Sequence, residues 1–497
     1  MISMLFDKTL KKFREELDEK YIGFSVNSSS IKPVHVANGL FRTLFGKVYN
    51  LENIGKFSYT RSNKGTTPPQ TKLSRIHKEY VEANKIETQN ISIDNFELLR
   101  RTAQSIVEAD KGVYDFKSTG MVSYTLPNKY FLTSSRTHTV SGDFMGSLIN
   151  KSGSRIVEMI KKDLDDDNDP ITLLFYPAIN LEEVQPIEFE GMDLNNIEGY
   201  KNGLFNNLIE NVGKSFDCLE SNLAVHPNKY VHLRQVNFLA IYYIILYISN
   251  LEYFYGLTTI KRPFLFDCSS DSRSEIAKAS SFCVSQINQS MSRCYSKLIA
   301  DELKNMPFHE SLLEEILESD EVPQYDLKKQ SKDSRLAFEE TWSLAKNKIK
   351  TLDDEDEKFL VLGSAIYNML ETEGSSTIIK YLKALGIKAG IIYPQANSVP
   401  NKRFVLATET LEVILKSCIE PNKSITLDEL LDVLWDRFNI VIGGRSKDED
   451  ILHEAGIYHA DSDSLKENQR NFVKLLEKMN FAELLADGIL QIKTGGE

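Results

Sequence analysis

The sequence has little cysteine or histidine, and its histidines form no cluster. Five cysteines lie at positions 218, 268, 283, 294 and 418, and no two of them form a C-x-x-C pair. An odd number of widely spaced cysteines is typical of a reducing compartment and not of a disulfide-bonded secreted protein. The eight histidines are scattered, so no metal site is indicated. We therefore predict a cytoplasmic protein with free thiols and without metal or other cofactor.

Long apolar runs and a secretion signal are also missing. The most apolar stretch, from Phe238 to Ile248, has eleven residues, whereas a membrane-spanning helix needs about twenty. The amino-terminal "MISMLFDKTLKKFREELDEK" is charged throughout and has no small-residue cleavage site. We expect no membrane contact, and we expect residues 230–256 to form a buried helix.

The chain is acidic as a whole, with a net charge of −12 over 497 residues. This charge excludes a protein that coats nucleic acid with its whole surface, so any such contact must come from a local basic patch. The length predicts several domains. A hydrophobic content of 41% and a charged content of 26% are those of a globular protein.

Helical periodicity dominates the chain, and strand-like segments are short, so we predict a mainly α fold with short strands (α+β) in several domains. Changes in composition and charge indicate four parts. They are a basic, aromatic-containing region (1–125), a central α/β or α+β body (126–318), a charged helical linker (319–358) and a helical, winged-helix-like C-terminal domain (359–497).

The stretch "RPFLFDCSSDSRSE" joins a short apolar run to a helical pattern over 274–304. A cysteine-dependent phosphatase needs an arginine six positions after its thiolate, but Arg273 follows Cys268 by five. An aspartyl phosphotransferase needs D-x-D, but Ser269 stands two after Asp267. A phosphoester hydrolase at Asp267, Cys268 and Arg273 remains the alternative to a structural role.

The structural interpretation of that stretch is a buried strand that leads into a capped helix. Ser272 and Glu275 have the spacing of a capping box. Further upstream, the aspartates of 165–169 alternate as in a calcium loop, but Pro170 occupies the glycine position and Tyr176 the closing glutamate position. The next segment, "ITLLFYPAI", resembles a strand.

The region from Lys32 to Lys78 is strongly basic. It has nine lysines and arginines against the single acid Glu52, a net of +8, with aromatic residues between them. Cations and aromatic faces suit phosphates and unstacked bases, although docking on an acidic protein surface is an equal alternative. The candidate nucleic-acid contacts here are Arg42, Lys47, Lys56, Tyr59, Arg61, Lys64, Lys72 and Arg75.

The C-terminal part has the helix and strand order of a winged helix. Its helices are "TETLEVILKSCI", "TLDELLDVLWDRF" and "SDSLKENQRNFVKLLEKM", with short strands at "NIVIGG" and "ADGILQIK". The second helix, capped by Thr426 and Glu429, is acidic and would repel a duplex. The third, capped by Ser464 and Glu467, aligns four cations at i, i+4 spacing, as a phosphate contact or as a solvated face. These four are Lys466, Arg470, Lys474 and Lys478.

The runs "TLDELLDVLWDRFNIVIGG" and "NFVKLLEKMNFAELLADGILQI" resemble the ends of large accessory proteins of prokaryotic anti-phage defence systems. The accessory subunits of phosphorothioation-dependent restriction are one such group. The resemblance covers only the C-terminal part and carries no catalytic motif. It implies a non-catalytic partner of a separate ATPase or nuclease that helps to sense or hold foreign DNA.

Together these features favour a DNA-associated adaptor or scaffold without catalytic activity, inside a larger protein complex. A hydrolase at Asp267, Cys268 and Arg273 and a purely protein-binding module are the alternatives.

Reversing the charges of Lys56, Arg61 and Lys64 is expected to weaken DNA binding without unfolding the chain, because phosphate contacts depend on these cations. Binding is measured at about 50 and 200 mM salt, a range over which phosphate-dominated complexes lose affinity steeply. Unchanged affinity would reject this surface.

Overall fold

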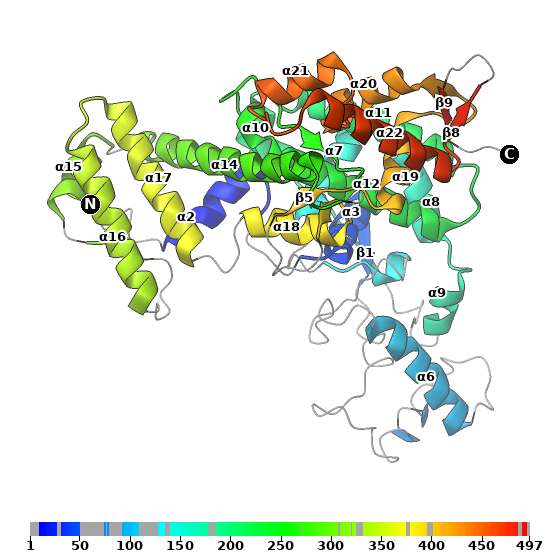
Figure 1. The fold of residues 1–497 in the computed structure, drawn as a ribbon. Helices are drawn as coiled ribbons and strands as arrows, with labels where there is room; N and C mark the ends of the chain where they lie inside the picture. The colour runs from blue at the N-terminus through cyan, green and yellow to red at the C-terminus, as the bar shows by residue number, and fades with distance from the viewer. Residues whose placement is uncertain are drawn as a thin grey trace. The chain divides into compact units, whose positions relative to one another are not determined.

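The chain is described here by a computed structural model in which helices predominate and all strands are short (Figure 1). This architecture confirms the mainly α class with short strands. The described residues are 9–26, 31–49, 74–75, 77–78, 92–108, 128–134, 140–176, 179, 185–269, 271–306, 309–319, 321–324, 332–373, 378–394, 401–485 and 490–494.

The described chain divides into two compact units, each assembled from separate segments. Unit 1 contains residues 1–31, 194–211 and 241–497, and unit 2 contains residues 32–193 and 212–240. Their limits differ from the four consecutive ranges expected from the sequence. Composition changes along the chain indicate linear boundaries only, whereas long-range packing brings distant segments into one unit.

Unit 2 is built around two closely packed helices, α3 (Pro33–Phe45) and α7 (Val140–Ser152). A Cβ atom at Gly142 would lie 2.1 Å from the carbonyl oxygen of Val36, so only glycine permits this backbone approach. The other elements of unit 2 include β1 (Lys47–Tyr49) paired antiparallel with β2 (Pro186–Glu188), α6 (Ile93–Glu108) and α8 (Ile156–Asp165).

The segment "ITLLFYPAI" was expected as a strand, and that expectation is wrong for its first half. Pro170–Phe175 form the short helix α9. Pro170 has the fixed φ suited to a first helical position, and the Asp169 side chain accepts hydrogen bonds from the backbone N–H groups of Ile171 and Thr172. Local capping outweighs the β-branched composition here.

The boundary between the units falls within α11 (Asn206–Leu223) and within the apolar helix α12 (Lys229–Ser249). In the described part of the chain, α12 alone is long and apolar enough to cross a membrane, and 83% of its apolar window is buried inside the protein. The predicted buried helix at 230–256 is therefore present as a core helix, and α13 (Leu251–Phe254) follows it.

The helices α14 (Glu275–Lys304) and α17 (Glu355–Glu373) pack side by side in unit 1 (Figure 1). A Cβ at Gly363 would lie 2.2 Å from the carbonyl oxygen of Ser296. α16 (Lys332–Ile349), inside the segment expected to be a linker, packs on α17 with Phe338 and Trp342 buried. The remaining helices described before residue 400 are α2 (Leu10–Leu17), η1 (Asp18–Ile22), η2 (Lys129–Phe131), η4 (Leu194–Asn196), α10 (Glu198–Lys201), α15 (His309–Glu318) and α18 (Ile378–Lys388).

The stretch "RPFLFDCSSDSRSE" forms a buried strand that leads into a capped helix, as its structural interpretation predicts. β3 (Phe264–Leu265) pairs in parallel with β7 (Ile440–Val441), and Phe266 forms a bridge to β5 (Arg403–Phe404). β5 pairs antiparallel with β4 (Ile392–Tyr393). The helix cap was misassigned, because Ser274, and not Ser272, accepts a hydrogen bond from the N–H of Ala277.

The C-terminal region contains a three-stranded antiparallel sheet whose strand order is β6-β9-β8. The predicted capping box of Thr426 and Glu429 is present at the start of the second helix. The elements, in chain order, are α19 (Thr408–Cys418), β6 (Ser424–Thr426), α20 (Leu427–Phe438), β7, α21 (Ser446–Glu454), α22 (Ser462–Lys478), β8 (Ala482–Leu484) and β9 (Leu490–Lys493).

Asn468, a buried residue of α22, links this helix to the ends of β3 and β7. Its Nδ2 donates to the carbonyl oxygens of Phe266 and Ile442, both at 2.8 Å. Its Oδ1 accepts from the N–H of Cys268 at 2.8 Å. One amide thus satisfies three backbone groups that two-residue strands leave without partners.

Replacing Asn468 by alanine is expected to lower the free energy of unfolding by about 3 kcal/mol, because a buried polar group left without a partner costs about 1–3 kcal/mol. Urea-induced unfolding measures the change. Asn471→Ala, a change of the same kind at a partly exposed position of α22, serves as the control. Equal losses in the two variants would contradict the proposed role.

Candidate functional site

The four cations predicted on the third C-terminal helix all lie on the exposed side of α22. Lys466, Arg470, Lys474 and Lys478 are exposed. Residues on the other side fill the core; the buried ones are Leu465, Asn468, Phe472 and Leu476, and Leu475 and Met479 are half-buried. At i, i+4 spacing the four cations extend over about 18 Å of helix.

Few ion pairs neutralise this stripe. The only ion pair formed by the four cations joins Arg470 to Glu467 at 3.4 Å, within the described residues, and both side chains are largely exposed. Exposed pairs of this kind contribute only about 0–1 kcal/mol, so Arg470 can change partner at little cost. The lysines are free to meet an external anion.

α22 begins at a different cap from the one predicted. Asp461 is the N-cap, and its carboxylate accepts from the N–H of Ser464 at 2.7 Å. This backbone hydrogen bond lowers the pKa of Asp461. The Ser464 hydroxyl instead contacts Glu275 at the start of α14. The sequence offers both candidates within one turn, and an aspartate is an equally good cap.

Arg42 is not a surface residue, so its assignment as a nucleic-acid contact is corrected. Its side chain is fully buried against α7, with Nε 2.7 Å from Oδ1 of Asp143 and Nη1 2.8 Å from the carbonyl oxygen of Thr133. The hydroxyl of Thr43 donates to the same carboxylate. Arg42 therefore neutralises a buried acid. Its partner Asp143 is distant in the sequence, so the spacing of residues could not identify this pair.

The other predicted cations of the N-terminal region differ in position. Lys47 is about half exposed and pairs with Glu188 across β1 and β2 at 3.6 Å. Arg75 is exposed on a short helical segment. The remaining residues of this prediction, Lys56, Tyr59, Arg61, Lys64 and Lys72, lie outside the described residues.

Asp267, Cys268 and Arg273 lie close together in the sequence but have separate surroundings. Asp267 is buried; its Oδ2 lies 2.7 Å from Nε of Arg403, and its Oδ1 accepts from the backbone and hydroxyl of Ser269. Cys268 is half-buried, and desolvation of its thiol together with the neighbouring Asp267 carboxylate raises its pKa. A raised pKa disfavours the thiolate that a nucleophilic cysteine requires. Arg273 is exposed.

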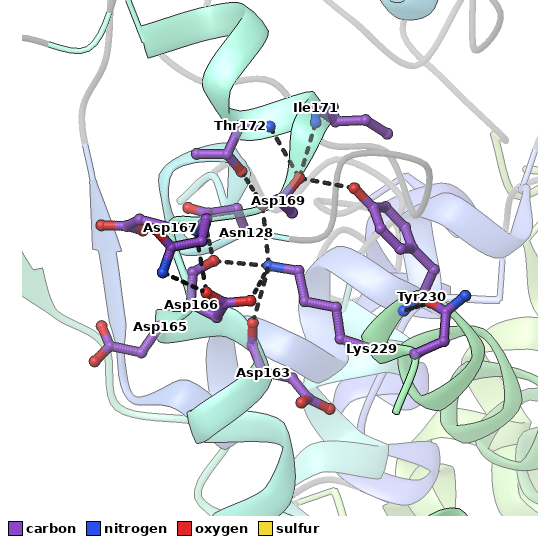
Figure 2. Close-up of polar contacts among 12 residues, drawn as sticks. Asn128, Asp163, Asp165, Asp166, Asp167, Asp169, Ile171, Thr172, Lys229 and Tyr230 are labelled. Atoms are coloured by element: carbon purple, nitrogen blue, oxygen red, sulfur yellow. Dashed lines mark hydrogen bonds and ion pairs between the residues drawn. The ribbon is translucent and has the colours of Figure 1, made fainter. Parts of the chain in front are cut away.

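The aspartates of 163–169 enclose an internal ammonium group (Figure 2). Nζ of Lys229, in the first turn of α12, lies 2.7 Å from the carbonyl oxygen of Asp166, 3.3 Å from that of Asp163 and 3.0 Å from Oδ2 of Asp169. Lys129 adds a second cation, with Nζ 2.7 Å from Oδ1 of Asp165. Lysine ammonium groups therefore neutralise the loop that resembled a calcium site.

Asp169 is the most highly bonded acid of this cluster. Burial alone would raise its pKa, but hydrogen bonds from Thr172, Tyr230 and Lys229 outweigh that effect and hold the pKa below its ordinary value. Figure 2 shows Asp169 between the start of α9 and the side chains of α12. The acid thus caps α9 and joins it to α12. In the described part of the chain, no group of three or more metal-ligating side chains is arranged to hold a metal ion.

His232, one helical turn after Lys229, adds a third cationic group against the acidic segment. Its Nδ1 lies 2.8 Å from Oδ2 of Asp163, and its Nε2 lies 2.8 Å from the carbonyl oxygen of His226. Only the doubly protonated ring can donate to both oxygens. Burial lowers the pKa of His232, but the Asp163 carboxylate outweighs burial and raises the pKa above 6.5.

The sequence contained a weak signal for this cluster. Lys229 and His232 have i, i+3 spacing at the start of the apolar helix and so share one face. Such a pair of cations beside an apolar run indicates a nearby acidic partner, but not which acids form it. Five aspartates lie within 163–169, and only the packing of α8 and α12 selects among them.

Comparisons with protein-family models and with curated proteins found no match for this sequence.

The folded-state pKa of His232 lies above its unfolded value of 6.5, so its ion pair stabilises unit 2 fully below about pH 6.5. That contribution is lost as pH rises through the raised pKa. We expect the difference in unfolding free energy between the wild type and His232→Gln to shrink between about pH 6 and pH 8. Urea titrations across this range measure it. The control is His453→Gln, at an exposed histidine, and a pH-independent difference for His232→Gln would refute the assignment.

Proposed function

We propose that this chain is a non-catalytic, DNA-associated adaptor subunit whose C-terminal region has a winged-helix-like fold and contacts the DNA backbone through α22. The observation that carries the proposal is the stripe of four exposed cations on the third helix of this topology. These cations are Lys466, Arg470, Lys474 and Lys478.

The order of elements supports a winged-helix-like fold. A helix (α19), a strand (β6), two further helices (α20 and α22) and two final strands (β8 and β9) follow one another, with β7 and α21 inserted between α20 and α22. The first strand pairs with the last, since Ile425 of β6 lies opposite Ile492 of β9. In helix-turn-helix proteins the last helix of the motif is the one that lies on DNA, and α22 occupies that place.

The charges of α22 favour the DNA backbone over the base edges. Its start carries Asp461, Asp463 and Glu467, and these acids would be repelled by phosphates if the N-terminus entered the major groove. The lysines continue to the last turn at Lys478. Contacts of this kind position a protein on a duplex and carry no sequence information. We therefore propose binding that is independent of base sequence.

The exposed cations of the N-terminal region form a second proposed contact. Arg75 is exposed and Lys47 is about half exposed, while the buried Arg42 is removed from this surface. Docking on an acidic protein is the alternative for this region. Binding measured with DNA as the ligand, and its dependence on salt, distinguishes a DNA contact from protein docking.

The proposed partner is a separate ATPase or nuclease of an anti-phage defence complex. This part of the proposal rests on the resemblance of the C-terminal segments to accessory subunits of such systems. The proposed compartment is the cytoplasm, because all five cysteines are free thiols and four of them are buried. Free thiols of this kind are typical of reducing compartments.

Replacing Lys466, Lys474 and Lys478 together by glutamate is expected to abolish DNA binding at about 150 mM salt. The slope of log affinity against log salt should fall by about 2–3 in magnitude, because each lost phosphate contact removes about 0.9. Fluorescence anisotropy with duplexes of unrelated sequence measures both quantities. None of the three lysines has an ion-pair partner in the described structure, so the fold should be unaffected.

The matched control reverses three exposed lysines elsewhere in unit 1, Lys201, Lys348 and Lys350, and so changes the net charge equally. Retained binding in the control with loss in the α22 variant supports the proposal. An equal loss of DNA binding in both variants would show that net charge alone causes the effect. Binding that the α22 variant retains in full would overturn the proposal.

A further inference from the structure

A pocket of about 740 Å³ lies in unit 1, where the first turns of α14 meet the β4–β5 segment and the residues before α22. Its volume is in the range of small-molecule sites. Lys278, Ser281 and Phe282 line it from α14, Tyr393 and Arg403 from the two strands, and His459 from the segment before α22.

Arg403 is the central feature of the pocket. Arg403 is only 9% exposed. Its Nε lies 2.7 Å from Oδ2 of Asp267, and the guanidinium carbon lies 5.2 Å from the centre of the Tyr393 ring. In the described structure no hydrogen bond uses its two terminal nitrogens. A guanidinium carries five N–H donors and no acceptor, so the terminal nitrogens of this pocket-lining residue can donate to an anion.

Positive charge exceeds negative charge around the pocket. Lys278 is exposed at its edge, and Nζ of Lys402 lies 2.6 Å from the carbonyl oxygen of the lining residue Pro394. Burial, together with the charge of Lys383, lowers the pKa of Lys402. Asp267 pairs with Arg403, and no described residue that lines the pocket is acidic. Lys278 and Arg403 would attract an anionic ligand, and an arginine fork matches phosphate geometry.

The pocket also has an aromatic wall. The rings of Phe282 and His459 are 4.3 Å apart at an interplanar angle of 37°. Phe282 is half-buried and lines this pocket. Aromatic faces of this kind stack on bases. A phosphate site beside a stacking surface is the combination that a nucleotide requires.

We propose that this pocket binds a nucleoside 5′-monophosphate unit, with the phosphate at Arg403 and Lys278 and the base on the wall of Phe282 and His459. The unit is either a free mononucleotide or the 5′-phosphorylated end of a nucleic-acid strand. The strand-end source rests on the proposed function, because α22 begins directly beyond His459. The free-nucleotide source does not depend on it.

Isothermal titration of the full-length protein with AMP, and with inorganic phosphate as competitor, tests the pocket. We expect saturable binding of AMP that phosphate weakens. Ser281→Glu, which places a carboxylate in the pocket, and Arg403→Gln should each weaken binding at least about tenfold, a loss of about 1.4 kcal/mol.

Two variants are needed because Arg403→Gln leaves Asp267 buried without its partner and can unfold the chain. Ser281→Glu leaves that pair intact. Its matched control is Gln289→Glu, which adds the same charge to an exposed position of α14 outside the pocket and should bind AMP as the wild type does. Absence of AMP binding to folded wild type, or unchanged affinity in Ser281→Glu, would overturn the proposal.

Oligonucleotides with and without a 5′-phosphate distinguish the two sources. A preference of at least about tenfold for the phosphorylated strand, lost in Ser281→Glu, identifies a strand end as the ligand. AMP binding without that preference identifies a free nucleotide. The triple lysine variant of α22 should bind AMP normally, so failure of the proposed DNA contact is distinguishable from failure of the pocket.

Discussion

The need to satisfy buried backbone groups at the ends of very short strands shapes unit 1. β3 and β7 are only two residues long, so their ladder leaves polar groups at its end without partners. The amide of Asn468 supplies these partners from α22. This contact anchors α22 to the ends of β3 and β7 through the buried side of the helix.

In unit 2, charged side chains satisfy buried oxygen atoms in a similar way. The segment 163–169 contains the last residues of α8 and the connection to α9, and its carbonyl and carboxylate oxygens accept hydrogen bonds from α12. Lys229 and His232, in the first turn of α12, supply the cations that these oxygens need. Breaking such a partly buried network leaves uncompensated charge, which is costlier than the contacts themselves. The acidic loop is therefore a structural joint between helices.

The two proposed ligand contacts of unit 1 share one region. The pocket around Arg403 involves the start of α14 and the residue His459, and Ser464 at the start of α22 contacts Glu275 of α14. A strand whose phosphates lie along α22 would have its end close to this pocket. One unit would then both hold the DNA backbone and recognise a terminal phosphate, which suits an adaptor that presents DNA to a separate enzyme.

Local sequence determined those features that depend on neighbouring residues. The helical class, the long helix from 275 to 304, the cap of Thr426 and Glu429 and the two-sided character of α22 all follow from spacing along the chain, because helix formation and capping act within a few residues. The exposure of Lys466, Arg470, Lys474 and Lys478 could be predicted in this way.

Tertiary structure alone decided which distant residues meet. It buried Arg42 against Asp143, paired Asp267 with Arg403, directed Phe282 into a pocket and placed Lys229 among the aspartates. Each of these contacts joins residues that are remote in sequence, and several partners of equal chemistry were available. Packing selects among them because a buried charge or amide is stable only where a partner of matching geometry is present.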